Sequence, residues 1–86
     1  MDKVKALIAA GATLSEAVRS ALADRSLAQV ALERQVDRSN LISALNGGRA
    51  PTRGDIDAMI AELGGTADDW RPLFADAMQK RVQATA

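Results

Sequence analysis

The sequence contains no cysteine, no histidine and no tyrosine, and its aromatic residues are one tryptophan and one phenylalanine. Without cysteine, a disulfide framework and a thiolate metal site are excluded. Without histidine, the commonest zinc ligand and the usual general base at neutral pH are missing, and so is a Ser-His-Asp triad. Gly47-Gly48 is not followed by the Gly-Lys-Ser/Thr of a phosphate loop. We therefore expect no enzyme: no catalytic residues, no metal and no cofactor.

Long apolar runs are also missing. No segment approaches the roughly 20 consecutive apolar residues of a membrane-spanning helix, and the N-terminus lacks the pattern of a signal peptide. A length of 86 residues suits one domain. The sequence therefore predicts a single cytoplasmic domain over residues 1–86 that does not associate with a membrane.

Charge is balanced in sum but uneven along the chain. Eleven basic and eleven acidic residues cancel. Residues 34–53 nevertheless carry four arginines against one aspartate, a balance of +3, and residues 54–70 carry five carboxylates and no basic residue, a balance of −5. A protein polarised in this way presents its basic region to a polyanion.

Helix starts are marked by side chains that can cap a first turn. Residues that resemble capping pairs, or a simple cap, stand at Thr13/Glu16, Ser26/Gln29, Asp37, Thr52/Asp55 and Thr66/Asp69. Glycines at 11, 47–48 and 64–65 mark helix ends. Helices are predicted near 14–23, 27–34, 38–46, 53–63 and 67–83, after a shorter one at 2–10. No segment alternates as a strand would, so the fold class is all-α, a bundle of five to six helices with its core over about 13–65.

Residues 26–47 form two of these helices around a short turn. Their apolar stripes are Leu27, Val30 and Ala31 in the first helix, and Leu41, Ala44 and Leu45 in the second. A turn as short as 35–37 makes two helices cross steeply, so that the second protrudes. The outer face of the second helix is polar and suits a DNA major groove. We expect base edges to be read by Arg38, Ser39, Ile42 and Ser43, with Arg38 bidentate on guanine and Ile42 on a thymine methyl.

Other polar residues around this helix are expected to meet the DNA backbone. Phosphate contacts fix the register of a protein on the duplex, and helix N-termini bind anions through their amides. The predicted phosphate contacts are Ser26, Asn40, Asn46, Arg49, Thr52 and Arg53. Double-stranded DNA is therefore the predicted partner.

The segment resembles the helix-turn-helix of the phage repressor and Cro family. Val30 and Ala31 match the family's apolar-then-alanine pair, Val36 its apolar residue after the turn, and Leu41 its buried anchor. Residues 44–47 are similar to the usual end of the recognition helix, and residues 50–52 to the loop that follows. The resemblance, over about residues 13–80, implies a lambda-repressor-like fold. Gln35 departs from it, because the family usually has glycine at this turn.

The last predicted helix carries both aromatic residues. Trp70, Phe74, Met78 and Val82 follow one another at a spacing of four. The stripe suits either the core or a contact between subunits, and residues 66–72 resemble the family's subunit-pairing helix. We expect a homodimer through residues 70–82 that reads a palindrome. Pro72 is expected to kink or restart this helix.

The predicted function is a sequence-specific transcriptional regulator, a repressor of phage, plasmid or mobile-element type that acts by occupying its operator. Such a protein would be associated with the bacterial nucleoid. The alternative is a protein-interaction module on the same fold, such as an antitoxin or an inhibitor of a bacterial machine. Its motivation is the zero net charge and the apolar residues near both chain ends, Val4, Leu7 and Ile8 at one and Trp70 and Phe74 at the other.

Overall fold

Six helices, joined by segments of three to seven residues, make up the part of the chain that the computed structural model describes, residues 1–85 with the side chains of 1–84. They are α1 (Asp2–Ala9), α2 (Leu14–Leu22), α3 (Leu27–Arg34), α4 (Arg38–Leu45), α5 (Arg53–Leu63) and α6 (Ala67–Thr85). No strand occurs within this part. The all-α class is confirmed, and every helix begins and ends within two residues of its predicted bounds. The radius of gyration, 11.8 Å, equals that of a compact chain of this length, about 12 Å.

Side-chain caps fix where five of the helices, α2 to α6, begin. The Thr13 hydroxyl accepts the Glu16 N–H at 3.1 Å, and the Glu16 carboxylate accepts the Thr13 N–H at the same distance. Equivalent reciprocal pairs cap α3, α5 and α6, at Ser26/Gln29, Thr52/Asp55 and Thr66/Asp69. Asp37 alone caps α4, through the Asn40 N–H at 2.8 Å. All five predicted caps are confirmed, because each depends only on residues three positions apart.

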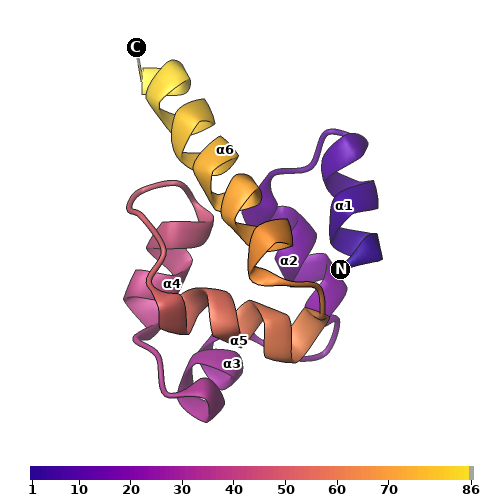
Figure 1. The fold of residues 1–86 in the computed structure, drawn as a ribbon, viewed down its shortest axis with the longest axis vertical. Helices are drawn as coiled ribbons and strands as arrows, with labels where there is room; N and C mark the ends of the chain where they lie inside the picture. The colour runs from indigo at the N-terminus through magenta and orange to yellow at the C-terminus, as the bar shows by residue number, and fades with distance from the viewer. Residues whose placement is uncertain (86) are drawn as a thin grey trace.

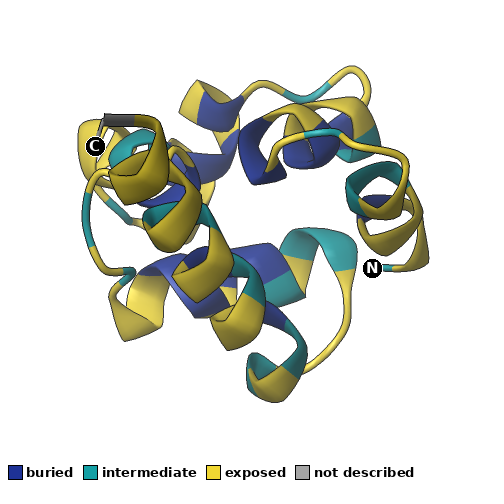
Figure 2. Cartoon of the chain, turned by 90° about the horizontal axis from the view of Figure 1, so that it is seen from above, coloured by how far each residue is buried: buried dark blue, intermediate teal, exposed yellow. Residues whose placement is uncertain are grey.

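The two aromatic side chains lie in the core of the chain itself. Trp70 and Phe74 are both 0% exposed, and Figure 2 shows the buried stretches turned toward the interior. The rings lie 6.3 Å apart between centroids, and the Trp70 indole N–H donates to the Gly64 carbonyl at 2.9 Å. Predicting them as dimerisation anchors was therefore wrong. The other helices leave a space that α6 fills, and large aromatic side chains fill such a space best.

Helix α1 is also part of the core. Val4 is 0% exposed, and Leu7 and Ile8 pack against the core from its edge. The N-terminal ammonium group of Met1 donates to the Leu63 carbonyl, at the end of α5. The core therefore extends beyond the predicted 13–65 at both ends, and the apolar residues near the chain ends are mostly interior rather than free surface.

Helix α6 is the longest element and runs unbroken through Pro72. Pro72 lies in the second turn, where its missing N–H removes one bond to the carbonyl four residues earlier. One lost bond this close to the start does not make the helix restart. Figure 1 shows the C-terminal half of α6 projecting beyond the other helices. Within residues 1–85, no helix combines the length and the apolar character that crossing a membrane requires.

Candidate nucleic-acid interface

Helices α3 and α4 are joined by the three residues Gln35, Val36 and Asp37, and they pack against each other (Figure 1). Gln35 has φ 58° and ψ 42°, the left-handed conformation that closes a helix end. The Val36 N–H then returns to the Ala31 carbonyl at 3.0 Å, and Asp37 caps α4. The chain therefore reverses sharply without leaving the carbonyl of Ala31 unpaired, although a non-glycine residue in this conformation costs about 1–2 kcal/mol.

Helix α4 has one buried face and one polar face. Leu41, Ala44 and Leu45 are at most 1% exposed and hold the helix against the core. Arg38 and Ser39, in the first turn, are exposed. Asn40 in the same turn and Asn46 just after the helix are exposed as well. These four side chains, which we call the α4 polar face, offer hydrogen-bond donors and acceptors to a partner.

Two of the predicted base-reading residues lie at the edge of this face. Ile42 is half-buried and packs against the core. Ser43 is half-buried as well, and its hydroxyl lies beneath the turn after α4, 2.7 Å from where a Cβ on Gly48 would be. Arg38 and Ser39 are therefore the more accessible members of the predicted set.

Four of the predicted phosphate contacts, Ser26, Arg49, Thr52 and Arg53, lie on elements next to α4. Ser26 and Thr52 are the exposed N-caps of α3 and α5, and each hydroxyl accepts a backbone N–H while keeping its own hydrogen to donate. The Arg53 side chain, at the first position of α5, is 92% exposed and 3.9 Å from the carboxylate of Asp57. Arg49, in the loop between α4 and α5, is half-buried, and its Nε–H donates to the Ala50 carbonyl at 3.4 Å.

Not every arginine of the basic segment is available to an external partner. The Glu62 carboxylate, whose side chain is only 8% exposed, accepts from Arg25 at 2.9 Å and from Arg34 at 3.1 Å. Arg25 also pairs with Glu33, and this contact lowers the pKa of the Glu33 carboxyl and raises the pKa of the Arg25 guanidinium. These four residues form what we call the Glu62 network. Arg34 therefore has a structural partner, and Arg38, Arg49 and Arg53 are the arginines of the segment outside this network.

A cation from the far end of the chain also lies at this surface. Helix α6 passes so close to the turn after α4 that a Cβ on Gly47 would lie 2.2 Å from the Ala77 carbonyl oxygen. A Cβ on Gly48 would lie 3.3 Å from Arg81. Arg81 therefore lies beside the turn after α4 and next to Asn46, which is one of the predicted phosphate contacts. The sequence carries no local signal for this proximity, because it arises from the packing of α6.

The other two predicted dimer residues, Met78 and Val82, are less buried than Trp70 and Phe74. Met78 is half-buried without belonging to the core, and Val82 is 66% exposed. Both lie on the projecting half of α6.

Among the described residues, no three histidine, cysteine, aspartate or glutamate side chains gather where they could hold a metal ion. No protein-family model matches the chain, and comparisons with curated proteins and with solved structures give no match either.

Proposed function

We propose that this protein binds double-stranded DNA at a specific sequence and represses transcription by occupying its operator. The observation that carries the proposal is the α4 polar face, which stands on a helix anchored by Leu41, Ala44 and Leu45. An α-helix with its side chains is about 10–12 Å across, and the major groove of B-DNA is about 12 Å wide. A rigid helix that carries short polar groups and one arginine is suited to that groove.

The residues around α4 support the same docking. With α4 in the major groove, the N-termini of α3 and α5 would approach the DNA backbone, where their caps and free amides favour phosphate. Positive charge near the loop after α4 and the start of α5 comes from Arg49, Arg53 and Arg81. Such contacts position a protein on DNA, whereas Arg38 and Ser39 would read the bases.

We further propose that the protein acts as a homodimer through the projecting half of α6. One recognition helix contacts few base pairs, and a second copy doubles the contacts when the two helices are about 34 Å apart. Trp70 and Phe74 are unable to form this contact because they are interior. Met78 and Val82 are apolar, outside the core and one helical turn apart, so they suit a two-fold contact.

Selection of bound duplexes from a random pool tests the proposal, followed by mobility shifts on the recovered site. The double variant Arg38→Ala/Ser39→Ala is expected to lose at least about tenfold in affinity and to relax the preferred sequence, since one bidentate base contact discriminates by about 1–3 kcal/mol. Arg71→Ala is the matched control, because Arg71 is an exposed arginine on α6 outside the interface. An equal loss in both variants, or no sequence preference at low salt, would contradict the proposal.

The protein-interaction alternative loses part of its motivation. Val4, Trp70 and Phe74 are interior, so they do not form apolar surfaces at the chain ends. The balanced net charge remains in its favour. A co-transcribed toxin-like gene would support this alternative, and a divergent promoter beside the gene would support the repressor.

A further inference from the structure

The turn after α4 contacts the backbone of α6 directly. Gly47 is buried and has a φ of +77°. A Cβ at this position would lie 2.2 Å from the Ala77 carbonyl oxygen, 2.6 Å from the Ala77 carbonyl carbon and 3.0 Å from the Met78 nitrogen. All three are backbone atoms, which cannot turn aside as the end of a side chain can. Only glycine therefore allows α6 to lie this close to the end of α4.

The contact lies where α6 leaves the core. Trp70 and Phe74 hold the first half of the helix, and both are 0% exposed. Ala77 packs against the edge of the core and rests on Gly47. Met78, the next residue, lies outside the core and begins the projecting half. The Gly47 contact therefore stands between the anchored half of α6 and the half proposed for the subunit contact.

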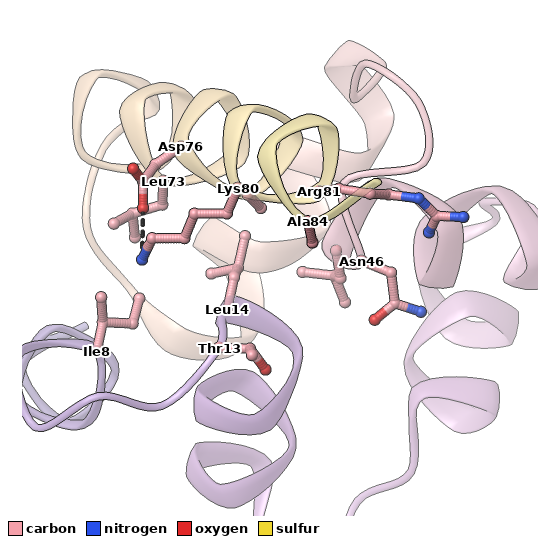
Figure 3. A pocket seen from close by; sticks show the side chains of 11 residues that line it. Ile8, Thr13, Leu14, Asn46, Leu73, Asp76, Lys80, Arg81 and Ala84 are labelled. Atoms are coloured by element: carbon pink, nitrogen blue, oxygen red, sulfur yellow. Dashed lines mark ion pairs between the residues drawn. The ribbon is translucent and has the colours of Figure 1, made fainter. Parts of the chain in front are cut away.

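Another flank of α6 faces space instead of packed side chains. A cleft of about 520 Å³ lies between α6 and the residues Ile8 of α1 and Leu14 of α2 (Figure 3). Asp76 and Lys80 line it from α6 and pair with each other along the helix at 2.9 Å. On this flank, α1 and α2 leave room for α6 to shift. The position of this part of α6 relative to α4 therefore depends strongly on the contact at Gly47.

We propose that Gly47 is a positioning residue that sets the angle between α4 and α6 and, through this angle, the spacing of the DNA half-sites that a dimer recognises. The part that concerns spacing rests on the proposed function. The base-reading surface stands on α4, and the proposed subunit contact, Met78 and Val82, stands on α6. The contact at Gly47 joins these two surfaces through backbone alone, so the recognition helix and the subunit contact form one rigid unit.

The closeness of the contact predicts the size of the effect. Ordinary van der Waals distances from a Cβ begin at 3.4 Å, so Gly47→Ala has to move the two segments apart by about 1.2 Å. A two-fold axis applies this shift to both copies, and the separation of the two α4 helices then changes by up to about 2.4 Å. Successive base pairs of B-DNA are about 3.4 Å apart. The change is a large part of one base-pair step, enough to disturb simultaneous binding of two half-sites without preventing the binding of one.

Residual dipolar couplings of the backbone amides measure the angle between α4 and α6 in the DNA-free protein. In the wild type, both helices should fit one common alignment. Gly47→Ala should change the angle between them, or reduce the couplings of α6 relative to those of α4. Gly11→Ala is the matched control, because Gly11 also has a positive φ, +107°, but a Cβ there meets nothing within 4 Å. An unchanged angle in folded Gly47→Ala would overturn the inference.

Gly47→Asn separates the contact from backbone strain. Asparagine tolerates a positive φ better than alanine and carries the same Cβ, so this variant should change the angle as Gly47→Ala does. A wild-type angle in Gly47→Asn would show that strain, and not the contact with α6, is the cause. If neither variant folds, the wild type decides. Couplings of residues 78–84 that are reduced relative to those of α4 would mean that the contact does not hold α6, and a common alignment would support the inference.

Mobility shifts on the selected DNA site test the part that concerns spacing. The wild type should prefer one spacing over those one base pair longer or shorter by at least about tenfold. Gly47→Ala should lose at least about tenfold of this preference, or move it by one base pair, while it binds a single half-site within about twofold of the wild type. Gly11→Ala should keep both properties. An equal loss on the half-site and on the palindrome would mean that the variant is only destabilised, and would refute this part.

Failure of the proposed function is distinguishable from failure of the positioning role. Absence of any DNA site, or a wild type that is monomeric in sedimentation, would refute the DNA-binding dimer and the effect on spacing with it. The dipolar couplings need neither DNA nor a dimer, so they would still decide whether Gly47 sets the angle between α4 and α6.

Discussion

At the scale of single residues, Gln35 shows how a short turn is achieved at some cost. Its left-handed conformation, φ 58° and ψ 42°, lets α3 end and α4 begin within three residues. The sequence indicated this strain, because the helix-turn-helix resemblance places a glycine there. Glycine adopts the conformation freely but loses more chain entropy on folding.

Replacing Gln35 by glycine is expected to stabilise the protein. Relief of about 1–2 kcal/mol of strain exceeds the entropy cost of glycine, about 0.5–1 kcal/mol, so the free energy of unfolding should rise by about 0.5–1 kcal/mol. Urea unfolding measures it. Gln35→Ala is the control, since it keeps the Cβ and should change little; an equal gain in both variants would show that the side chain, and not the backbone, is the cause.

At the scale of elements, the Glu62 network ties α3 to α5 across the turn before α3. Arg25 comes from that turn, Glu33 and Arg34 from α3, and Glu62 from α5. The network sits on the side of α3 that packs toward α5, so it holds the first helix of the α3–α4 pair in place. In the proposed function its contribution is therefore indirect, through the orientation of α4.

Glu62→Gln should destabilise the protein by about 1–2 kcal/mol, because two arginines lose a charged acceptor that is mostly buried. Asp57→Asn is the matched control on the same helix. Its side chain is 64% exposed and 3.9 Å from Arg53, so the expected change is below about 0.5 kcal/mol. Thermal unfolding at low and high salt compares the two variants. A loss in Glu62→Gln no larger than in the control would mean that the network is only a surface feature.

At the scale of the whole molecule, carboxylates join distant parts of the chain and make stability depend on acid pH. Asp69 accepts from Lys5 of α1 at 2.9 Å and from Thr66, and these contacts lower the pKa of the Asp69 carboxyl. Thr13 lowers the pKa of Glu16, and Arg25 lowers that of Glu33. A carboxyl whose pKa is lower in the folded state stabilises the fold above its unfolded pKa and loses that contribution as pH falls through the folded value.

We therefore expect the free energy of unfolding to decline as the pH falls below about 4.3, the ordinary pKa of a glutamate carboxyl group. Because the chain has no histidine, no imidazole adds a second transition near pH 6.5. Asp69→Asn should make the acid decline shallower. Asp68→Asn is the control, because the Asp68 side chain is 98% exposed. Urea unfolding at several pH values gives the comparison, and identical acid profiles for wild type and Asp69→Asn would contradict the assignment.

Assembly is the other property of the whole molecule. Val82→Glu places a charge in the proposed subunit contact and should give a folded monomer with much weaker binding to a palindromic site. Ala84→Glu adds the same charge about half a turn around α6 from Val82 and should leave the dimer intact. Sedimentation and mobility shifts on full and half sites measure both. A wild type that is monomeric and binds a half-site as tightly as the palindrome would exclude the dimer.

The sequence by itself determined the helices, their starts and the short turn between α3 and α4. Each cap joins residues three positions apart, and the buried stripe of α4 repeats every three or four residues. Because these patterns span only three or four residues, each can be recognised within a single helix. For the same reason the exposed positions of Arg38, Ser39 and Asn46 could be predicted from the pattern that buries Leu41 and Leu45.

Only the tertiary structure decided which apolar stripe belongs to the core and which groups the arginine side chains contact. Trp70 and Phe74 have the same spacing in an interior helix and in a subunit contact, so their burial depends on the space left by the other helices. Arg34 faces Glu62, and Arg81 lies beside Gly48, across contacts between residues far apart in the chain. The shape of that packing is a property of all six helices together, and no local pattern in the chain encodes it.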